Sequence, residues 1–400
     1  MLAPSQEVRT EDKTRPDDFY TSPNAVVYIF GVIDSLVPFS YILNVYPDYW
    51  HAATLAIKLA LCLVYYRYIS ISRIAVMSAL VLTSIILISS VPGGSQFSDY
   101  VKIFGFMTHV FITLTMVRRD NLQKYVLTCV GVLFASTLIY LLAAKTGHID
   151  ITYGRYSYFH HSHPNLGSEI IAMSVVLAAC VLSWPLFLVV TLPSLYAIYL
   201  MEGRAAFVVA VITIGAKLVY EEWNNKKRLA LILGGLACAG AALLLLSNKA
   251  AALLNSILLL HDKYRGLGSG FVGRDQLWSV AWHWFLASPI IGNGAGFFDR
   301  YGVEIHNFFL FGLSEFGILS LVIYGMIFFL LYDLYRTNRK WFFCFLGIPV
   351  FWMFNDRFFN INPYPFLFYI VLFAHANTAA AGWQPALLMR KAKPPVNPAS

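Results

Sequence analysis

Residues 306–317 read HNFFLFGLSEFG and decide the fold class, because a polar pair there opens a long apolar run. His306 and Asn307 stand where a polar stretch passes into residues that favour the interior of a membrane. Three arginines, Arg265, Arg274 and Arg300, lie shortly upstream. The pattern places a titratable imidazole beside cations at a bilayer surface, which indicates chemistry on an anionic, lipid-linked ligand.

Apolar runs of this kind recur along almost the whole chain. Hydrophobic residues make up 58% of the sequence and charged residues only 12%, whereas soluble domains carry about 25% charged residues. A membrane span needs about 20 mostly apolar residues. The composition therefore predicts an all-α, polytopic membrane protein and excludes a soluble domain with a single anchor.

The apolar runs predict about twelve transmembrane helices. Their centres fall near residues 31, 60, 81, 108, 133, 173, 192, 211, 235, 319, 349 and 369. The predicted divisions are an N-terminal tail (1–24), spans one to nine (25–247), a large, partly helical external loop (248–305), spans ten to twelve (306–380) and a C-terminal tail (381–400). The first tail lacks the layout of a cleavable signal peptide, so we expect the first span to act as an uncleaved signal-anchor.

Lysine and arginine in the short connections set the orientation, because cytoplasmic loops are enriched in them. With the N-terminus inside, most of the 29 basic residues fall in cytoplasmic loops and tails. Both termini are therefore expected in the cytoplasm. The net charge of +8 reflects this topology and does not indicate a nucleic-acid partner.

Arginines in the external loops oppose this charge rule and are candidates for phosphate binding, because their planar fork matches phosphate oxygens. A short turn over residues 201–206 places Arg204 at the start of a helix, and helix N-termini favour anions. Residues 274–289 predict a tryptophan-rich helix that begins at Arg274 and is stopped by Pro289. Each arginine taken alone can equally be an ordinary hairpin residue or a contact to lipid headgroups.

A cluster of histidines, including His161 and His163, shares the external loop 145–165 with Arg155. Histidines can bind a metal. No carboxylate or cysteine lies beside them at a recognised metal-binding spacing, so we predict neither a metal nor another cofactor. The glycines of residues 292–296 follow no strand and predict a turn, not a dinucleotide site.

Three ionisable residues, Asp34, Lys58 and Glu315, fall inside predicted spans, where an unpaired charge is costly. Asp34 and Lys58 lie half-way along two spans joined by a short turn, which predicts that they form an ion pair. Glu315 is expected to brace neighbouring helices. The cysteines all lie in apolar runs and show neither a disulfide nor a zinc pattern.

Several of these features together resemble the bacterial O-antigen ligase and polymerase superfamily. They are the stretch from His306 to Gly317, residues 203–205, Gly273-Arg274 with the tryptophan-rich helix, residues 163–167, and a large late external loop. Ligases of the family often carry a small residue or tyrosine three places after the last glycine of that stretch, where this chain has Ser320. The choice between a ligase and a polymerase therefore stays open.

The resemblance implies a membrane glycosyltransferase in the bacterial inner membrane, with its active site facing the periplasm. Its donor would be an undecaprenyl-pyrophosphate-linked glycan. The acceptor hydroxyl would belong to the lipid A core in a ligase, or to another lipid-linked glycan in an O-antigen or exopolysaccharide polymerase.

We expect His306 to be the catalytic base and Arg204 and Arg274 to bind the pyrophosphate, with inversion at the sugar and no metal. Further candidates are Arg155, His161, His163, Arg265, Asn307, Glu315 and Arg357. A transporter or flippase for lipid-linked glycans is the competing class. Transporters hold their substrate near the middle of the bilayer, often between repeats, whereas the ionisable residues here cluster at its outer surface.

Overall fold

The computed structural model describes residues 23–69, 71–93, 95–152, 155–159, 163–223, 225–228, 274–354, 363–377 and 382–383, with scattered residues between 230 and 241. The N-terminal part forms helices α1 (Pro23–Ser35), α2 (Val37–Ile42), α3 (Pro47–Val64), α4 (Arg73–Gly93), α5 (Phe97–Met116), α6 (Leu122–Thr146), α7 (Pro164–Val181), α8 (Trp184–Leu200) and α9 (Arg204–Glu222), with a 3-10 turn η2 (Tyr66–Tyr68). The C-terminal part forms α12 (Arg274–Ala287), α13 (Phe297–Tyr301), α14 (Phe308–Phe316), η4 (Gly317–Leu319), α15 (Ser320–Thr337), α16 (Arg339–Cys344), η5 (Phe345–Gly347), α17 (Ile348–Phe354) and α18 (Pro363–Ala376).

Two short antiparallel strand pairs interrupt this otherwise helical architecture. β1 (Ile71–Ser72) pairs with β4 (Gly382–Trp383), and β2 (Ile151–Thr152) pairs with β3 (Arg155–Tyr156). Each strand is only two residues long, so the pairs tie loops together and build no sheet core.

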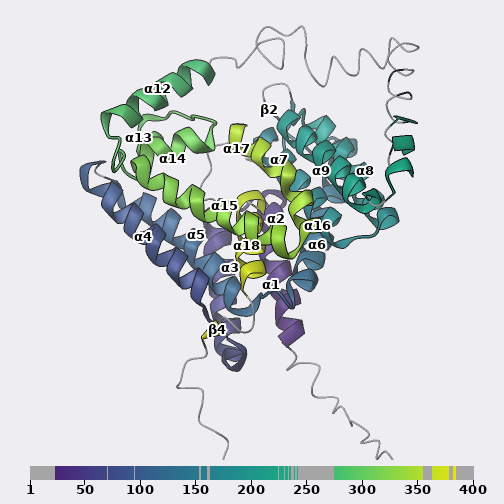
Figure 1. The fold of residues 1–400 in the computed structure, drawn as a ribbon, viewed down its shortest axis with the longest axis horizontal. Helices are drawn as coiled ribbons and strands as arrows, with labels where there is room; N and C mark the ends of the chain where they lie inside the picture. The colour runs from purple at the N-terminus through teal and green to yellow at the C-terminus, as the bar shows by residue number, and fades with distance from the viewer. Residues whose placement is uncertain are drawn as a thin grey trace, which may run out of the picture.

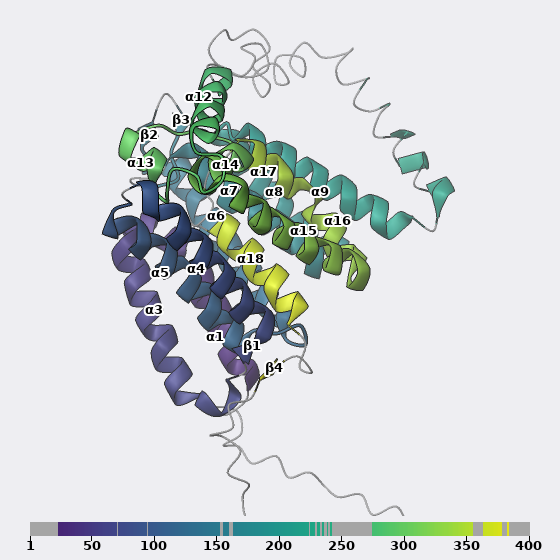
Figure 2. The same cartoon turned by 60° about the vertical axis from the view of Figure 1, so that its left-hand side comes forward.

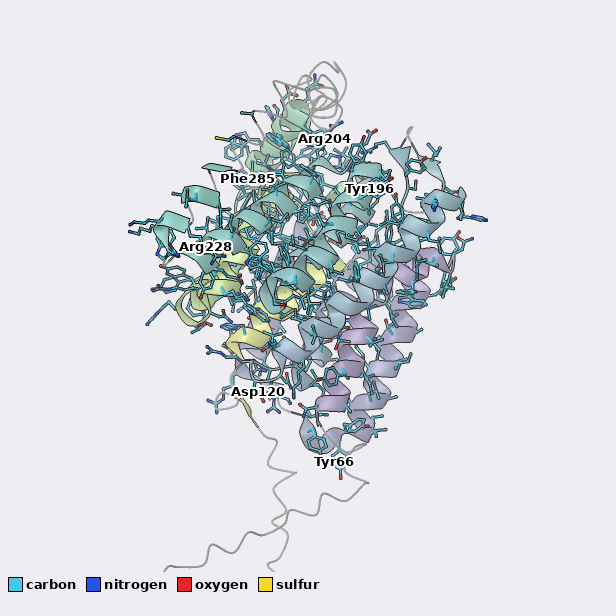
Figure 3. The ribbon with its side chains drawn as sticks, turned by 90° about the vertical axis from the view of Figure 1, so that its right-hand side faces the viewer. Tyr66, Asp120, Tyr196, Arg204, Arg228 and Phe285 are labelled. Atoms are coloured by element: carbon cyan, nitrogen blue, oxygen red, sulfur yellow. The ribbon has the colours of Figure 1, made fainter. Side chains whose placement is uncertain are left out.

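The helices form one bundle with two distinct ends. Figure 1 shows α12, α13, α14 and β2 at one end of the bundle, and the start of α1 and β4 at the other. In Figure 2, α3, α4 and α5 run alongside one another between these ends. Figure 3 places Arg204 at one end, called the upper end below, and Tyr66 and Asp120 at the opposite, lower end.

The centres of the predicted spans fall in helical segments wherever the structure describes them, although the segments near residues 319 and 349 are divided into shorter helices. Four helical segments are long and apolar enough to cross a membrane among the described residues: Arg73–Val91, Leu122–Thr146, Pro164–Val181 and Phe308–Thr337. They are consistent with an all-α membrane protein. The ninth predicted span, residues 248–273 of the large loop, and most of the two tails lie outside the described residues.

Burial separates a central helix from a peripheral one. In α7, 89% of the span lies inside the protein, whereas in α4 only 22% does. A helix that is apolar on every side and buried on every side belongs at the centre of a bundle. The largely exposed apolar surface of α4 is suited to contact with lipid.

A cluster of polar side chains is buried between α1, α3, α5 and α6. Asp34 and Lys58 form an ion pair in which neither side chain is more than 1% exposed, which confirms the predicted pairing. The hydroxyl groups of Thr113 and Tyr125 each donate to Asp34 Oδ2 at 2.9 Å. Lys58 Nζ donates to Thr113 Oγ1 at 2.9 Å and lies 3.5 Å from Nδ1 of His109. Each charge is thus paired and hydrogen-bonded, as burial in an apolar surrounding requires.

Candidate functional site

Arg204 begins α9 directly after a tight turn at the upper end, as the sequence predicts. The turn is held by a hydrogen bond from the backbone N–H of Gly203 to the carbonyl of Ile198, at 3.1 Å. A Cβ atom added to Gly203 would lie 2.2 Å from Ser168 Cβ, in the first turns of α7. Only glycine therefore lets this turn approach α7 so closely. The N-termini of α7 and α9 consequently meet, and both favour anions.

Arg274 begins α12, and this helix ends at Ala287, just before Pro289. The predicted helix and its end before Pro289 are confirmed. The Arg274 side chain is half-buried, and its guanidinium carbon lies 5.2 Å from the centre of the Phe354 ring. Burial, followed by the like charge of Arg204, lowers the pKa of Arg274. Arginine still stays charged, because its ordinary pKa lies above about 12.

The influence of Arg204 on Arg274 also reports their proximity. Geometry connects them as well: Phe354, at the end of α17, contacts the Arg274 guanidinium, and α17 packs against α9, which begins at Arg204. Arg204 and Arg274, called the arginine pair below, come from α9 and α12, which are far apart in sequence. The short helix α17 therefore connects the two residues predicted to bind pyrophosphate.

Arg155 and His163 lie around the N-terminus of α7. Arg155 Nη1 donates to Oδ1 of Asn165 at 3.2 Å, which links the β2–β3 pair to the first turn of α7. His163 is the N-cap residue of α7, and its Nδ1 accepts a hydrogen bond from the backbone N–H of Asn165 at 3.2 Å. The cap gives His163 a structural role that accounts for its position before Pro164. Asn165 was not among the predicted site residues.

His306 and Asn307 have different roles at the start of α14. Asn307 Oδ1 accepts hydrogen bonds from the backbone N–H groups of Phe309 (3.1 Å) and Leu310 (3.0 Å), so Asn307 caps the helix. His306 lies just outside it, with its side chain 32% exposed and its Nε2 3.4 Å from Oε2 of Glu304. Its φ of 51° is in the left-handed region. That conformation is uncommon for residues other than glycine and recurs at functional sites.

A glycine-rich loop closes the other end of α14. The helix ends at Gly317, which has a φ of 60°. The backbone N–H groups of Asn293 and Gly294 donate to the carbonyls of Ser314 (3.0 Å) and Glu315 (2.9 Å). The predicted turn at residues 292–296 thus satisfies carbonyls that the broken helix leaves open. The Glu315 side chain is buried, 2% exposed, on the side where α14 packs within the bundle.

The short helix α17 joins the parts of the site. It packs against both α9 and α14. Its Trp352 ring stacks on Phe308, with centroids 5.4 Å apart and an interplanar angle of 17°. Its last residue, Phe354, contacts the guanidinium of Arg274. These aromatic contacts link residues that are distant in sequence, so no local sequence pattern predicts them.

Three predicted site residues, His161, Arg265 and Arg357, lie outside the described residues. Among the residues that the structure describes, no group of three or more His, Cys, Asp or Glu side chains is arranged to hold a metal ion. Comparison of the chain with protein-family models, with characterised proteins and with solved structures finds no match.

Proposed function

We propose that this chain is a bacterial membrane glycosyltransferase of the O-antigen ligase type, which moves a glycan from undecaprenyl pyrophosphate to an acceptor hydroxyl. The observation that carries the proposal is Arg204 at the start of α9, where this N-terminus approaches the first turns of α7, with Arg274 connected to α9 through Phe354 of α17. Two forked cations and two positive helix ends suit a pyrophosphate, whose negative charge grows as it leaves. The order of the sequence features described above supports the choice of family.

The reaction follows from the chemistry of the groups. His306 accepts the proton of the acceptor hydroxyl while the hydroxyl oxygen forms a bond to the anomeric carbon. The bond from that carbon to the pyrophosphate oxygen breaks, and its electron pair leaves with the undecaprenyl pyrophosphate. One displacement of this kind inverts the anomeric centre. The energy is already present in the donor, so the reaction needs no nucleotide.

The proposed orientation places the upper end in the periplasm and both termini in the cytoplasm, with about twelve spans in the inner membrane. It is supported by the position of Arg204 at one end of the bundle and Asp120, next to the basic residues 118 and 119, at the other. Single-cysteine labelling of intact cells, in a cysteine-free background, tests it. Residues 204 and 274 should react with an impermeant reagent and residue 119 should not. The reverse pattern would invert the topology.

The decisive assay uses the purified chain in liposomes with an undecaprenyl-pyrophosphate-linked glycan and a lipid A core acceptor. We expect a glycosylated core and released undecaprenyl pyrophosphate. Product formed only when a second lipid-linked glycan serves as acceptor would identify a polymerase. Movement of the intact donor across the bilayer, with no new glycosidic bond, would refute the proposal in favour of a transporter.

Site variants connect this activity to the geometry. Arg204→Ala and Arg274→Ala should each nearly abolish transfer, and lysine should rescue poorly because it lacks the two-donor fork. His306→Gln should bind donor and transfer little, because glutamine cannot take the proton. The matched control is Arg228→Ala, since Arg228 is 65% exposed and lies away from the upper end. Near-normal turnover by His306→Gln would remove His306 from the role of base.

A further inference from the structure

Arg204 and Arg274 carry like charges, and keeping them near each other before an anion arrives costs free energy. A contact that offsets this repulsion without covering the guanidinium N–H groups would leave the pair ready for a ligand. The face of an aromatic ring attracts a cation in this way. The Arg274 guanidinium carbon lies 5.2 Å from the centre of the Phe354 ring, within range of that attraction.

We propose that Phe354 is a positioning residue, whose ring holds Arg274 beside Arg204 so that the arginine pair is already formed when pyrophosphate binds. The inference rests on the proposed function for the identity of the anion. Preformed sites bind more tightly because less ordering remains to be done on binding. Phe354 itself does not touch the reacting atoms and acts through Arg274.

The ring can serve this purpose because α17 is firmly anchored. Phe351 is fully buried and Trp352 is 3% exposed. The Trp352 ring stacks on Phe308 and packs edge-on against Phe368, with centroids 5.8 Å apart. Since Phe308 follows Asn307 directly, the same short helix supports the segment that bears His306. Phe354 therefore presents its ring from an element fixed relative to both α9 and α14.

Arg274 stands at the start of a helix whose own anchoring contacts lie further along: Trp278 Nε1 donates to the Ile305 carbonyl at 3.1 Å, and Ser314 Oγ donates to the Ala281 carbonyl at 2.8 Å. Among the described residues of α12, only Ala281 is buried. The neighbouring core of Ala281, Phe298 and Ile305 holds the middle of α12 and not its first residue. The contact with the Phe354 ring adds a fixed point at Arg274, the first residue of α12.

Substitutions at Phe354 separate ring chemistry from bulk. Phe354→Leu keeps an apolar side chain and removes the aromatic face, and we expect it to weaken the binding of inorganic pyrophosphate by about 2- to 30-fold. Phe354→Trp keeps the face and should bind nearly as the parent does. The matched control is Phe328→Leu, because the Phe328 ring packs on Trp352 from α15, with centroids 6.2 Å apart. It should change the affinity by less than about twofold.

A double-mutant cycle with Arg274 gives the decisive test, with titration calorimetry on the full chain in nanodiscs. If Phe354 acts through Arg274, then Phe354→Leu weakens binding in the parent and adds nothing once Arg274 is alanine. Independent, additive losses would mean a merely structural role and overturn the proposal. Unchanged affinity in Phe354→Leu, with Arg274→Ala still impaired, would overturn it as well and leave the proposed function intact.

The same double-mutant cycle, measured by thermal unfolding without ligand, tests the positioning role of Phe354 independently of the proposed function. We expect the two substitutions to be non-additive there too, because the contact exists before any anion binds. If the parent protein binds no pyrophosphate, the proposal that its donor is a pyrophosphate-linked glycan is refuted. Additive shifts in the unliganded cycle would then show that Phe354 does not hold Arg274, whatever the true ligand is.

Discussion

Removal of one partner from the buried pair of Asp34 and Lys58 should destabilise the bundle strongly. In Lys58→Met the Asp34 carboxylate keeps only the hydroxyl groups of Thr113 and Tyr125, at 2.9 Å each. In Asp34→Asn the Lys58 ammonium group keeps Thr113 and His109. An uncompensated buried charge of this kind costs about 3–5 kcal/mol. We expect values near the lower end, because the remaining partners still solvate each charge.

The double variant Asp34→Asn/Lys58→Met should recover most of this loss. The introduced asparagine would still accept the two hydroxyl hydrogen bonds, and methionine fills the space of the lysine stem without a charge. Replacement of a buried ion pair by neutral groups of similar volume is often nearly neutral, so we expect a net loss of about 1–2 kcal/mol. The two substitutions should therefore be strongly non-additive.

Unfolding by sodium dodecyl sulfate in mixed micelles, followed by circular dichroism, measures these differences. Lys124→Met is the control, because Lys124 makes an exposed hydrogen bond to Asn24 and its loss should cost less than about 0.5 kcal/mol. A double variant no more stable than the worse single variant would refute the reasoning. That result would mean that the two charges are stabilised separately and not by each other.

Three further substitutions test the backbone around the site by thermal unfolding. Gly203→Ala brings a Cβ to 2.2 Å from Ser168, so it should lower the free energy of unfolding by about 1–3 kcal/mol and displace the start of α9. The control is Gly215→Ala in the same helix, whose added Cβ meets open space and should be neutral or stabilising. Equal effects of the two substitutions would contradict the close approach of Gly203 to α7. Asn307→Ala should lower the stability by about 1 kcal/mol because the N-cap of α14 is lost, whereas Asn307→Asp should keep the cap. An unchanged melting temperature in the alanine variant would argue against the capping role. Gly317→Ala should cost about 1–3 kcal/mol because of its positive φ, and full stability would show that the helix break is not needed.

The sequence was most informative where a residue type has one strong physical requirement. Asp34 and Lys58 could be paired in advance because a membrane interior does not tolerate a lone charge. The start of α9 at Arg204 followed from the preceding turn, and the end of α12 followed from Pro289. These inferences needed only local patterns and the assumption of a bilayer.

Local sequence patterns of this kind could not predict the contacts between segments that are distant in sequence. The sequence predicted one span near residue 319, and Gly317 divides this segment into α14 and α15. The break is stable because carbonyls of α14 are satisfied by residues 293 and 294, and this pairing depends on tertiary structure. The contact of Phe354 with Arg274 is of the same kind. The capping role of Asn307, in contrast, was visible in principle, since asparagine before an apolar run is a favoured N-cap.

The break at Gly317 has a consequence for the depth of the site. The segment Phe308–Thr337 has 30 residues, which corresponds to about 45 Å of helix and exceeds a hydrocarbon core of about 30 Å. The 18 residues of α15 alone extend about 27 Å and nearly match that core. The break at Gly317 allows α15 alone to match that core without a tilt of the whole segment. In a thicker or thinner bilayer we expect α15 to adjust its tilt, while α14 and the residues before it keep their depth at the edge of the hydrocarbon core.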